Sequence, residues 1–147
     1  MPTVETTSSI VIPAPPARVY ETVTSPENWL GTHPVTVGVL NAPARPAVSG
    51  EHWTEVIRTP AGQTADLAWT VDRAEPPRRW EISTDRLLAD HVRCVITYTF
   101  AEQPGATLFT RRMAVTYPDG ALDDQSAARF GNPAVHDQYL ANVKKLL

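Results

Sequence analysis

One charged residue, Arg111, stands on a strand face that is otherwise apolar, which makes it the chain's strongest candidate for chemistry. Successive side chains of a β-strand point to opposite faces. Arg111 therefore shares its face with four apolar or aromatic residues: Phe109, Met113, Val115 and Tyr117. A buried guanidinium needs an anionic or carbonyl partner, because burying it unpaired costs several kcal/mol. We expect Arg111 to hold an acidic side chain, or a carboxylate or enolate oxygen of a ligand.

Glu55 occupies a similar position, between Trp53 and Ile57. The same alternation turns its carboxylate inward, where it can pair with Arg111 or accept a proton from a ligand. A competing interpretation shifts the strand register by one residue. In another, both charged side chains lie in water at the open end of the sheet.

Three further polar side chains fall beside the same apolar faces. Tyr98 lies inward with Ile96 and Phe100, and Tyr139 lies on the apolar stripe of a C-terminal helix. Either hydroxyl can donate a hydrogen bond to a ligand oxygen, or be satisfied by the backbone within the core. His136 lies at the edge of the helix stripe, where a neutral imidazole can act as a base near pH 7 or can simply mark the boundary of the core.

These positions give a predicted site. The predicted catalytic residues are Arg111, Glu55 and His136. The predicted ligand-binding residues are mostly aromatic or apolar: Trp53, Trp69, Tyr98, Phe109, Met113, Tyr139 and Val143. The four histidines are too widely spaced for a local metal motif, and no phosphate-binding or dinucleotide-binding glycine motif is present, so we expect neither a metal nor a cofactor. Cys94, the only cysteine, is interpreted as a small buried hydrophobe rather than a nucleophile.

Size and charge narrow the class of protein. The 147 residues fit one domain, residues 1–147, with room for a core and a modest cavity. The net charge of −3 and the lack of a basic run argue against nucleic-acid binding. No apolar stretch approaches the length of a membrane span, and no secretory signal is visible. The single cysteine fits a reducing cytoplasm, and the richness in Ala, Arg and Pro suits a GC-rich bacterial genome.

Proline and glycine residues divide the chain into short elements. We expect a strand over residues 4–12, a short helix opened by Pro15 and Pro16, and a second helix with Ser25 as its N-cap. Strands then follow around residues 35–39, 53–57, 67–71, 80–82, 92–100 and 107–117. Short strands separated by turn residues are typical of an antiparallel meander.

The C-terminal segment predicts the longest helix, with Asn132 as N-cap and Pro133 as its first residue. Its apolar stripe is formed by Val135, Tyr139, Val143 and Leu146, with Leu140 and Leu147 on the flank. No other element is long enough to cover the apolar face of the sheet. The predicted fold is α+β: a seven-stranded curved antiparallel sheet around a long C-terminal helix, plus two short helices.

Two connecting segments are candidates for covering a pocket. The stretch 85–90 exposes Leu87 and Leu88 at a hairpin tip, which is unfavourable unless they cover something. The segment 118–131 is long for a connection and precedes the main helix, as lids often do. Both segments can equally be local packed turns.

Three segments together carry a family pattern: Ser9–Ile12 with Ala14–Tyr20, Leu67–Trp80, and Val95–Phe100 with Pro104–Thr107. They resemble the opening strand and A-P-x-x-V-aromatic run, the W-x-V…P-P run and the late hairpin of the START-like (SRPBCC) superfamily. Within it, the chain is similar to the polyketide cyclase/dehydrase and lipid-transport-like group. The resemblance implies a helix-grip fold, of the START and birch-pollen-allergen type, with an internal apolar cavity. It does not choose an activity, because the superfamily includes cyclases, lipid carriers, hormone receptors and co-chaperones.

Two functions fit these observations. In the first, the chain binds a small hydrophobic molecule of polyketide, aromatic or lipid type and catalyses its cyclisation or dehydration. Arg111 would then stabilise an enolate, Glu55 or His136 would take a proton, and Tyr98 or Tyr139 would donate one. In the second, the same cavity carries a lipid or other hydrophobic metabolite without chemistry. A co-chaperone or regulatory role follows from the resemblance alone, and oligomeric state is left open.

Overall fold

The computed structural model describes residues 1–147 and is built on a seven-stranded antiparallel sheet in the order β1-β7-β6-β5-β4-β3-β2. Strands β2 to β7 each lie beside the next strand in the sequence, and β1 pairs with β7 at one edge of the sheet. The strands are β1 (Thr3–Ile12), β2 (Thr36–Leu40), β3 (His52–Arg58), β4 (Thr64–Glu75), β5 (Arg79–Thr84), β6 (Arg93–Gln103) and β7 (Ala106–Thr116). The predicted meander is confirmed.

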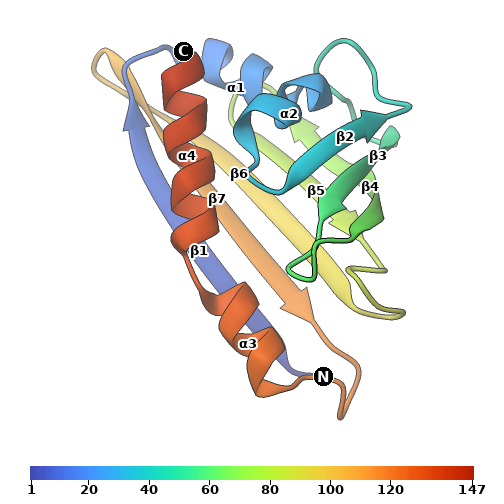
Figure 1. The fold of residues 1–147 in the computed structure, drawn as a ribbon. Coiled ribbons are helices and arrows are strands. Elements are labelled where there is room, and N and C mark those ends of the chain that lie inside the picture. Colours follow the sequence, from blue (N-terminus) through green and yellow to red (C-terminus); the bar gives the residue numbers. More distant parts are fainter.

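Helices cover only the concave side of this sheet (Figure 1). They are α1 (Pro16–Thr24), the 3-10 turn η1 (Pro26–Asn28), α2 (Trp29–Thr32), α3 (Asp124–Gly131) and α4 (Ala134–Leu146). Helix α4 runs along β1, α1 and α2 close one end of the sheet, and α3 lies over β1 near the other end. The predicted helix-grip fold is confirmed. None of these helices combines the length and the apolar character that crossing a bilayer requires.

Alternation along the strands separates a buried face from an outer face. On β7 the inward residues from Thr107 to Val115 are buried, while Arg112 on the opposite face is exposed. Strand β3 follows the same rule, with Trp53, Glu55 and Ile57 inward. The predicted register is therefore confirmed, and the one-residue shift is excluded. The long β6–β7 pair brings Tyr98 opposite Arg111.

The buried stripe of α4 differs from the predicted one. Val135 is 48% exposed and Leu146 is 54% exposed, so both were wrongly placed on the buried face. The side chains that α4 buries are His136, Tyr139, Leu140 and Val143. Their spacing of three, one and three residues is that of one helix face, with a histidine at its first position. The side chain of His136 is therefore buried in the interior.

The segment between β7 and α4 was expected to be an irregular connection, and this was wrong. Residues Asp124–Gly131 form α3, whose first turn is capped by the Asp123 carboxylate accepting from the backbone N–H of Ser126 at 2.7 Å. The hydroxyl of Thr6 on β1 donates to the carbonyl of Phe130 and ties the end of α3 to the sheet. The lid-like segment is therefore an anchored helix.

The second short helix also differs from expectation. Ser25 occupies the N-cap position, as predicted, but its hydroxyl makes no capping bond and instead donates to the carbonyl of Glu21 at 2.8 Å. The segment begins as the 3-10 turn η1 and continues as α2, which buries Trp29 but leaves Leu30 exposed. Asn142 of α4 donates to the carbonyl of Thr32 at 2.9 Å, so α2 and α4 are joined at this end of the fold.

The corrected face of α4 predicts how two leucines of that helix differ in their effect on stability. Leu140→Ala removes a fully buried side chain and is expected to lower the free energy of unfolding by about 3 kcal/mol. Leu146→Ala removes the same atoms from an exposed position and is expected to change it by less than about 1 kcal/mol. Urea unfolding of both variants measures the difference. Equal losses of stability would contradict the buried face of α4 described above and support the one predicted from the sequence.

Candidate functional site

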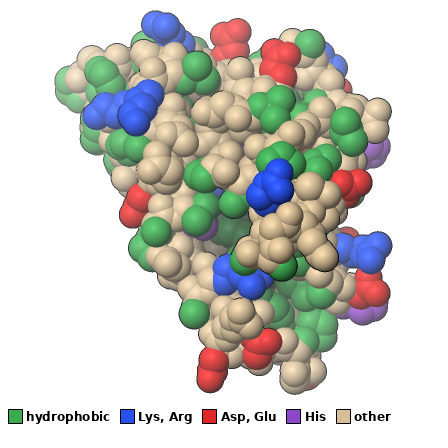
Figure 2. Space-filling model, in the orientation of Figure 1, with side chains coloured by type: hydrophobic (Ala, Val, Ile, Leu, Met, Phe, Trp, Pro, Cys, Tyr) green, Lys and Arg blue, Asp and Glu red, His purple; other side chains and the backbone are tan.

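The covering helices do not fill the concave side of the sheet, and a cavity of about 230 Å³ remains. Its walls come from β3, β4, β6 and β7 on the sheet side and from α2, α3 and α4 on the helix side. Figure 2 shows its mouth as a hollow with hydrophobic side chains on the walls and basic side chains on two sides of the rim. Most of the wall is apolar, so the few polar groups on it stand out.

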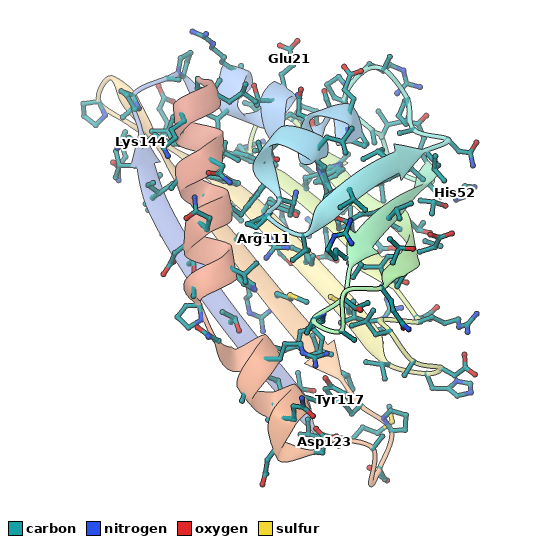
Figure 3. The ribbon with its side chains drawn as sticks, in the orientation of Figure 1. Glu21, His52, Arg111, Tyr117, Asp123 and Lys144 are labelled. Atoms are coloured by element: carbon teal, nitrogen blue, oxygen red, sulfur yellow. The ribbon has the colours of Figure 1, made fainter.

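Arg111 lies on the floor of this cavity, between α4 and the sheet (Figure 3). It is 7% exposed and has no carboxylate within salt-bridge distance. Its Nη1 donates to the ring of His136, 2.9 Å from Nδ1 and 3.3 Å from Nε2, and its Nε lies 3.4 Å from the hydroxyl of Tyr98. The guanidinium carbon also lies 5.7 Å from the ring centre of Tyr98 and 5.3 Å from that of Tyr139. A buried positive charge is thus surrounded only by neutral groups.

Glu55 lies on the same cavity but is not paired with Arg111. Its Oε1 accepts from the indole N–H of Trp69 at 2.9 Å, and its Oε2 accepts from the hydroxyl of Thr36. Burial raises the pKa of Glu55 above its usual value, although both hydrogen bonds and the charge of Arg111 act to lower it. Of the two partners foreseen for Arg111, an internal carboxylate is therefore excluded, and the ligand oxygen remains.

His136 is neutral in this environment. Burial, and then the positive charge of Arg111, lowers the pKa of His136 to about 4. Because one ring nitrogen accepts from Arg111, the lone pair that a general base would use is already occupied. His136 therefore supports the guanidinium of Arg111 through this contact.

His33 is a cavity residue that the sequence analysis did not find. Its ring stacks on Tyr139 with 4.0 Å between ring centres and packs against Trp29 at 4.1 Å. Neither ring nitrogen has a hydrogen-bond partner, and burial, followed by the positive charge of Arg111, lowers its pKa well below the usual value. A buried polar group without a partner is uncommon in proteins. No periodic pattern reaches this residue, which ends the four-residue helix α2.

The other predicted residues divide into two groups. Trp69, Met113 and Tyr139 line the cavity. Trp53, Phe109 and Val143 are buried behind its wall, where Trp53 stacks on Trp80 and Phe109 stacks on Phe100. These three shape the core and do not reach the cavity. Tyr98 is also behind the wall and reaches the site through its hydrogen bond to Arg111. Cys94 is buried, and burial raises its pKa to about 12.

Both segments proposed as covers reach the mouth of the cavity. Leu87 is buried and Leu88 half-exposed, and both line the wall. Helix α3 contributes Arg129 and Phe130. The loop 85–90 therefore covers an apolar space, as the two leucines at its tip indicated.

A second hollow, of about 500 Å³, lies on the outer face of β4 and β5. It is lined by polar and small residues such as Asp66, Thr70 and Arg86, and it is open to solvent. No buried titratable group faces it, so the chemistry gathers in the smaller internal cavity. No group of three or more His, Cys, Asp or Glu side chains is close enough to hold a metal ion.

The lowered pKa of His136 predicts how stability depends on pH. The folded state keeps His136 neutral down to about pH 4, whereas the unfolded chain protonates it near pH 6.5. The unfolded state therefore binds more protons in this window, and the free energy of unfolding falls as the pH is lowered from 6.5 to about 4. His136→Gln keeps an acceptor for Arg111 but cannot titrate, and should remove up to about 2 kcal/mol of that fall. Urea unfolding across this pH range checks it; parallel curves for both proteins would contradict it.

Comparison with known proteins identifies the family. Residues 3–147 match the model of the family described as polyketide cyclase / dehydrase and lipid transport. A protein named Penitrem biosynthesis cluster 1 protein I, from Penicillium ochrochloron, is 31% identical over 143 residues, which cover 94% of this chain and 92% of the relative.

Solved structures agree on the fold. A START superfamily protein from Mycobacterium smegmatis matches with a TM-score of 0.72 and 13% identity, covering 97% of this chain and 99% of that one. Ara h 8.0201 matches with a TM-score of 0.73 and 10% identity, covering 99% and 97%. The di-domain ARO/CYC protein BexL of the BE-7585A biosynthetic pathway gives 0.74 and 19%, covering 97% of this chain and 49% of its own. The chain belongs to the polyketide cyclase / dehydrase and lipid transport family.

Proposed function

We propose that this protein binds a small hydrophobic carbonyl compound in the internal cavity and promotes its cyclisation through an enolate. The observation that carries the proposal is the buried guanidinium of Arg111, which faces the cavity without an anionic partner. A charge held in this way stabilises a negative oxygen far more effectively than a solvated one, because the surroundings are apolar and already ordered. An enolate oxygen is such a group, and the apolar walls suit the carbon skeleton that bears it.

The relatives support this direction. The family description includes cyclases and dehydrases, and the relative from Penicillium ochrochloron is named for a biosynthesis cluster. BexL is described as an ARO/CYC protein of a biosynthetic pathway. A cyclisation of this kind requires only a pocket that folds the substrate, a base and an oxyanion site, and this cavity offers all three.

The steps follow from the positions of the charged groups. The Glu55 carboxylate takes a proton from a carbon beside a carbonyl, and the resulting enolate oxygen is held by Arg111. The enolate carbon then attacks a second carbonyl of the same molecule, which forms a carbon–carbon bond and leaves an alkoxide. The alkoxide takes the proton back from the Glu55 carboxylic acid, so the residue is regenerated. Loss of water from the product then gives an unsaturated ring.

A carrier function without chemistry is the second candidate, and one observation favours it. Both Glu55 oxygens already accept hydrogen bonds from Thr36 and Trp69, and this reduces the basicity of the carboxylate. In that case Arg111 would bind a carboxylate or carbonyl oxygen of a lipid or aromatic metabolite. Turnover separates the two functions, whereas ligand binding is common to both.

Ligand binding can be tested first by thermal shift with aromatic polyketides, fatty acids and isoprenoids. At least one class should raise the melting temperature, because a ligand at a hundredfold excess over its Kd stabilises the folded state by about 2.7 kcal/mol. Arg111→Leu should remove most of this shift while leaving the empty protein at least as stable, since an apolar side chain replaces a buried unpaired charge. A ligand that binds the variant with unchanged affinity would refute the role of Arg111.

Glu55 gives a pH test of the catalytic form of the proposal. Only the carboxylate accepts a proton, and burial raises its pKa, so the rate should rise with pH through a value above that of an ordinary glutamate. Glu55→Gln keeps the size of the side chain and should lower the rate at least a hundredfold while changing ligand affinity little. Turnover or ring closure of a poly-ketone, followed by mass spectrometry, measures this. A variant with the wild-type rate and pH profile would exclude Glu55 as the base.

A further inference from the structure

We propose that the ligand of this cavity carries, besides the oxygen held by Arg111, a permanently anionic group that stays at the mouth between Arg58 and Arg129. This inference deepens the proposed function, because it defines the ligand as an apolar skeleton with a charged end. A carboxylate, sulfonate or phosphate group would each satisfy it.

Most arginines of this chain are paired with a carboxylate. Six arginines lie within 4.0 Å of a carboxylate: Arg45, Arg73, Arg79, Arg86, Arg93 and Arg112. The five that have no such partner are Arg18, Arg58, Arg78, Arg111 and Arg129. Three of these five, Arg58, Arg111 and Arg129, line the one cavity. Three of the five arginines without a carboxylate partner therefore lie together where a ligand would lie.

The negative charge of the protein is elsewhere. The chain as a whole carries −3, yet Glu55 is the single acidic residue on the cavity wall, and it is buried beside Trp69 and Thr36. The residues that line the mouth therefore include two basic side chains and no acidic one, on a protein that is negative overall. A pair of cations placed in this way attracts anions and raises their rate of association.

The two outer arginines come from opposite sides of the mouth. Arg58 is the last residue of β3, and its Nη1 donates to the carbonyl of Gly62 at 3.3 Å. Arg129 is in the last turn of α3, with its guanidinium 5.9 Å from the ring centre of Phe130. Both side chains are exposed, so each keeps free N–H groups for a ligand. Figure 2 shows basic side chains on two sides of the hollow, as this arrangement requires.

The size of the cavity indicates which end of the ligand enters it. A volume of about 230 Å³ holds a small ring system and leaves little room for a hydrated ionic group. Burying a full charge beside apolar walls is costly, whereas the mouth offers water and two cations. The apolar part therefore enters first, towards Arg111, and the ionic group remains outside.

Two dyes with the same rings give a direct test. Anilinonaphthalene sulfonate carries an anionic group, and N-phenylnaphthylamine is the same ring system without it. We expect wild-type protein to bind the sulfonate more tightly, and the double variant Arg58→Gln, Arg129→Gln to lose about tenfold of that affinity at low ionic strength. Binding of the uncharged dye should change less than twofold. Added salt should weaken binding of the sulfonate to wild-type protein more than to the double variant.

The double variant Arg18→Gln, Arg78→Gln is the matched control, because it also removes two exposed arginines without a carboxylate partner, one in α1 and one between β4 and β5, and neither lines the cavity. It should leave both affinities unchanged. The proposal is overturned if the mouth variant (Arg58→Gln, Arg129→Gln) binds the sulfonate as wild type does, or if the control variant lowers its affinity equally, which would indicate overall charge alone. A loss seen only in Arg111→Leu would move the anion inside and also overturn it.

These outcomes are separable from those of the proposed function. The mouth variant keeps Arg111 and Glu55, so its loss of affinity for the sulfonate tests the mouth alone, whereas the effects of Arg111→Leu on binding and of Glu55→Gln on turnover test the proposed function. Failure of Arg111→Leu to weaken binding and of Glu55→Gln to slow turnover would remove the proposed function while leaving the dye result in place.

Discussion

The burial of one unpaired positive charge organises the site of this protein. The guanidinium of Arg111 is fixed by the antiparallel pairing of β6 and β7, which sets it opposite Tyr98, and by α4, which brings His136 within 2.9 Å. Its charge helps to keep the His136 and His33 rings neutral. Two tyrosine rings offer it their faces. Each of these groups moderates the charge and none cancels it, so the guanidinium stays available to an oxygen that enters the cavity.

Keeping Arg111 and Glu55 apart has the same consequence. Had they formed a salt bridge, each would have neutralised the other, and a ligand would have had to break that bond first. Instead the carboxylate is held by Trp69 and Thr36, on strands β4 and β2, while the guanidinium is held from β6 and α4. The curvature of the sheet separates the two groups across one apolar space. An acid–base group and an oxyanion site are thus present together without cancelling each other.

Much of this arrangement could be predicted from the sequence, because strand alternation has a period of two and a single inward residue fixes a whole face. That rule placed Arg111, Glu55 and Tyr98 correctly. Helix periodicity was less decisive on α4: counting only apolar residues selected Val135 and Leu146, whereas the buried face includes the polar His136. His33 and Thr36 were not predicted as site residues, for another reason. One ends a four-residue helix and the other precedes a register shift in β2, and neither belongs to a regular pattern. Which residues meet there depends on tertiary contacts that no local period encodes.

Four features of the protein that oppose its stability lie around one cavity. They are a guanidinium without an anion, an imidazole without hydrogen-bond partners, a carboxyl whose ionisation burial disfavours, and apolar walls in contact with unfilled space. Each could be relieved by a single apolar substitution or a small repacking. A ligand with an oxygen for Arg111 and an apolar body for the walls relieves several of them at once, and binding then stabilises the fold by the same contacts that position the ligand.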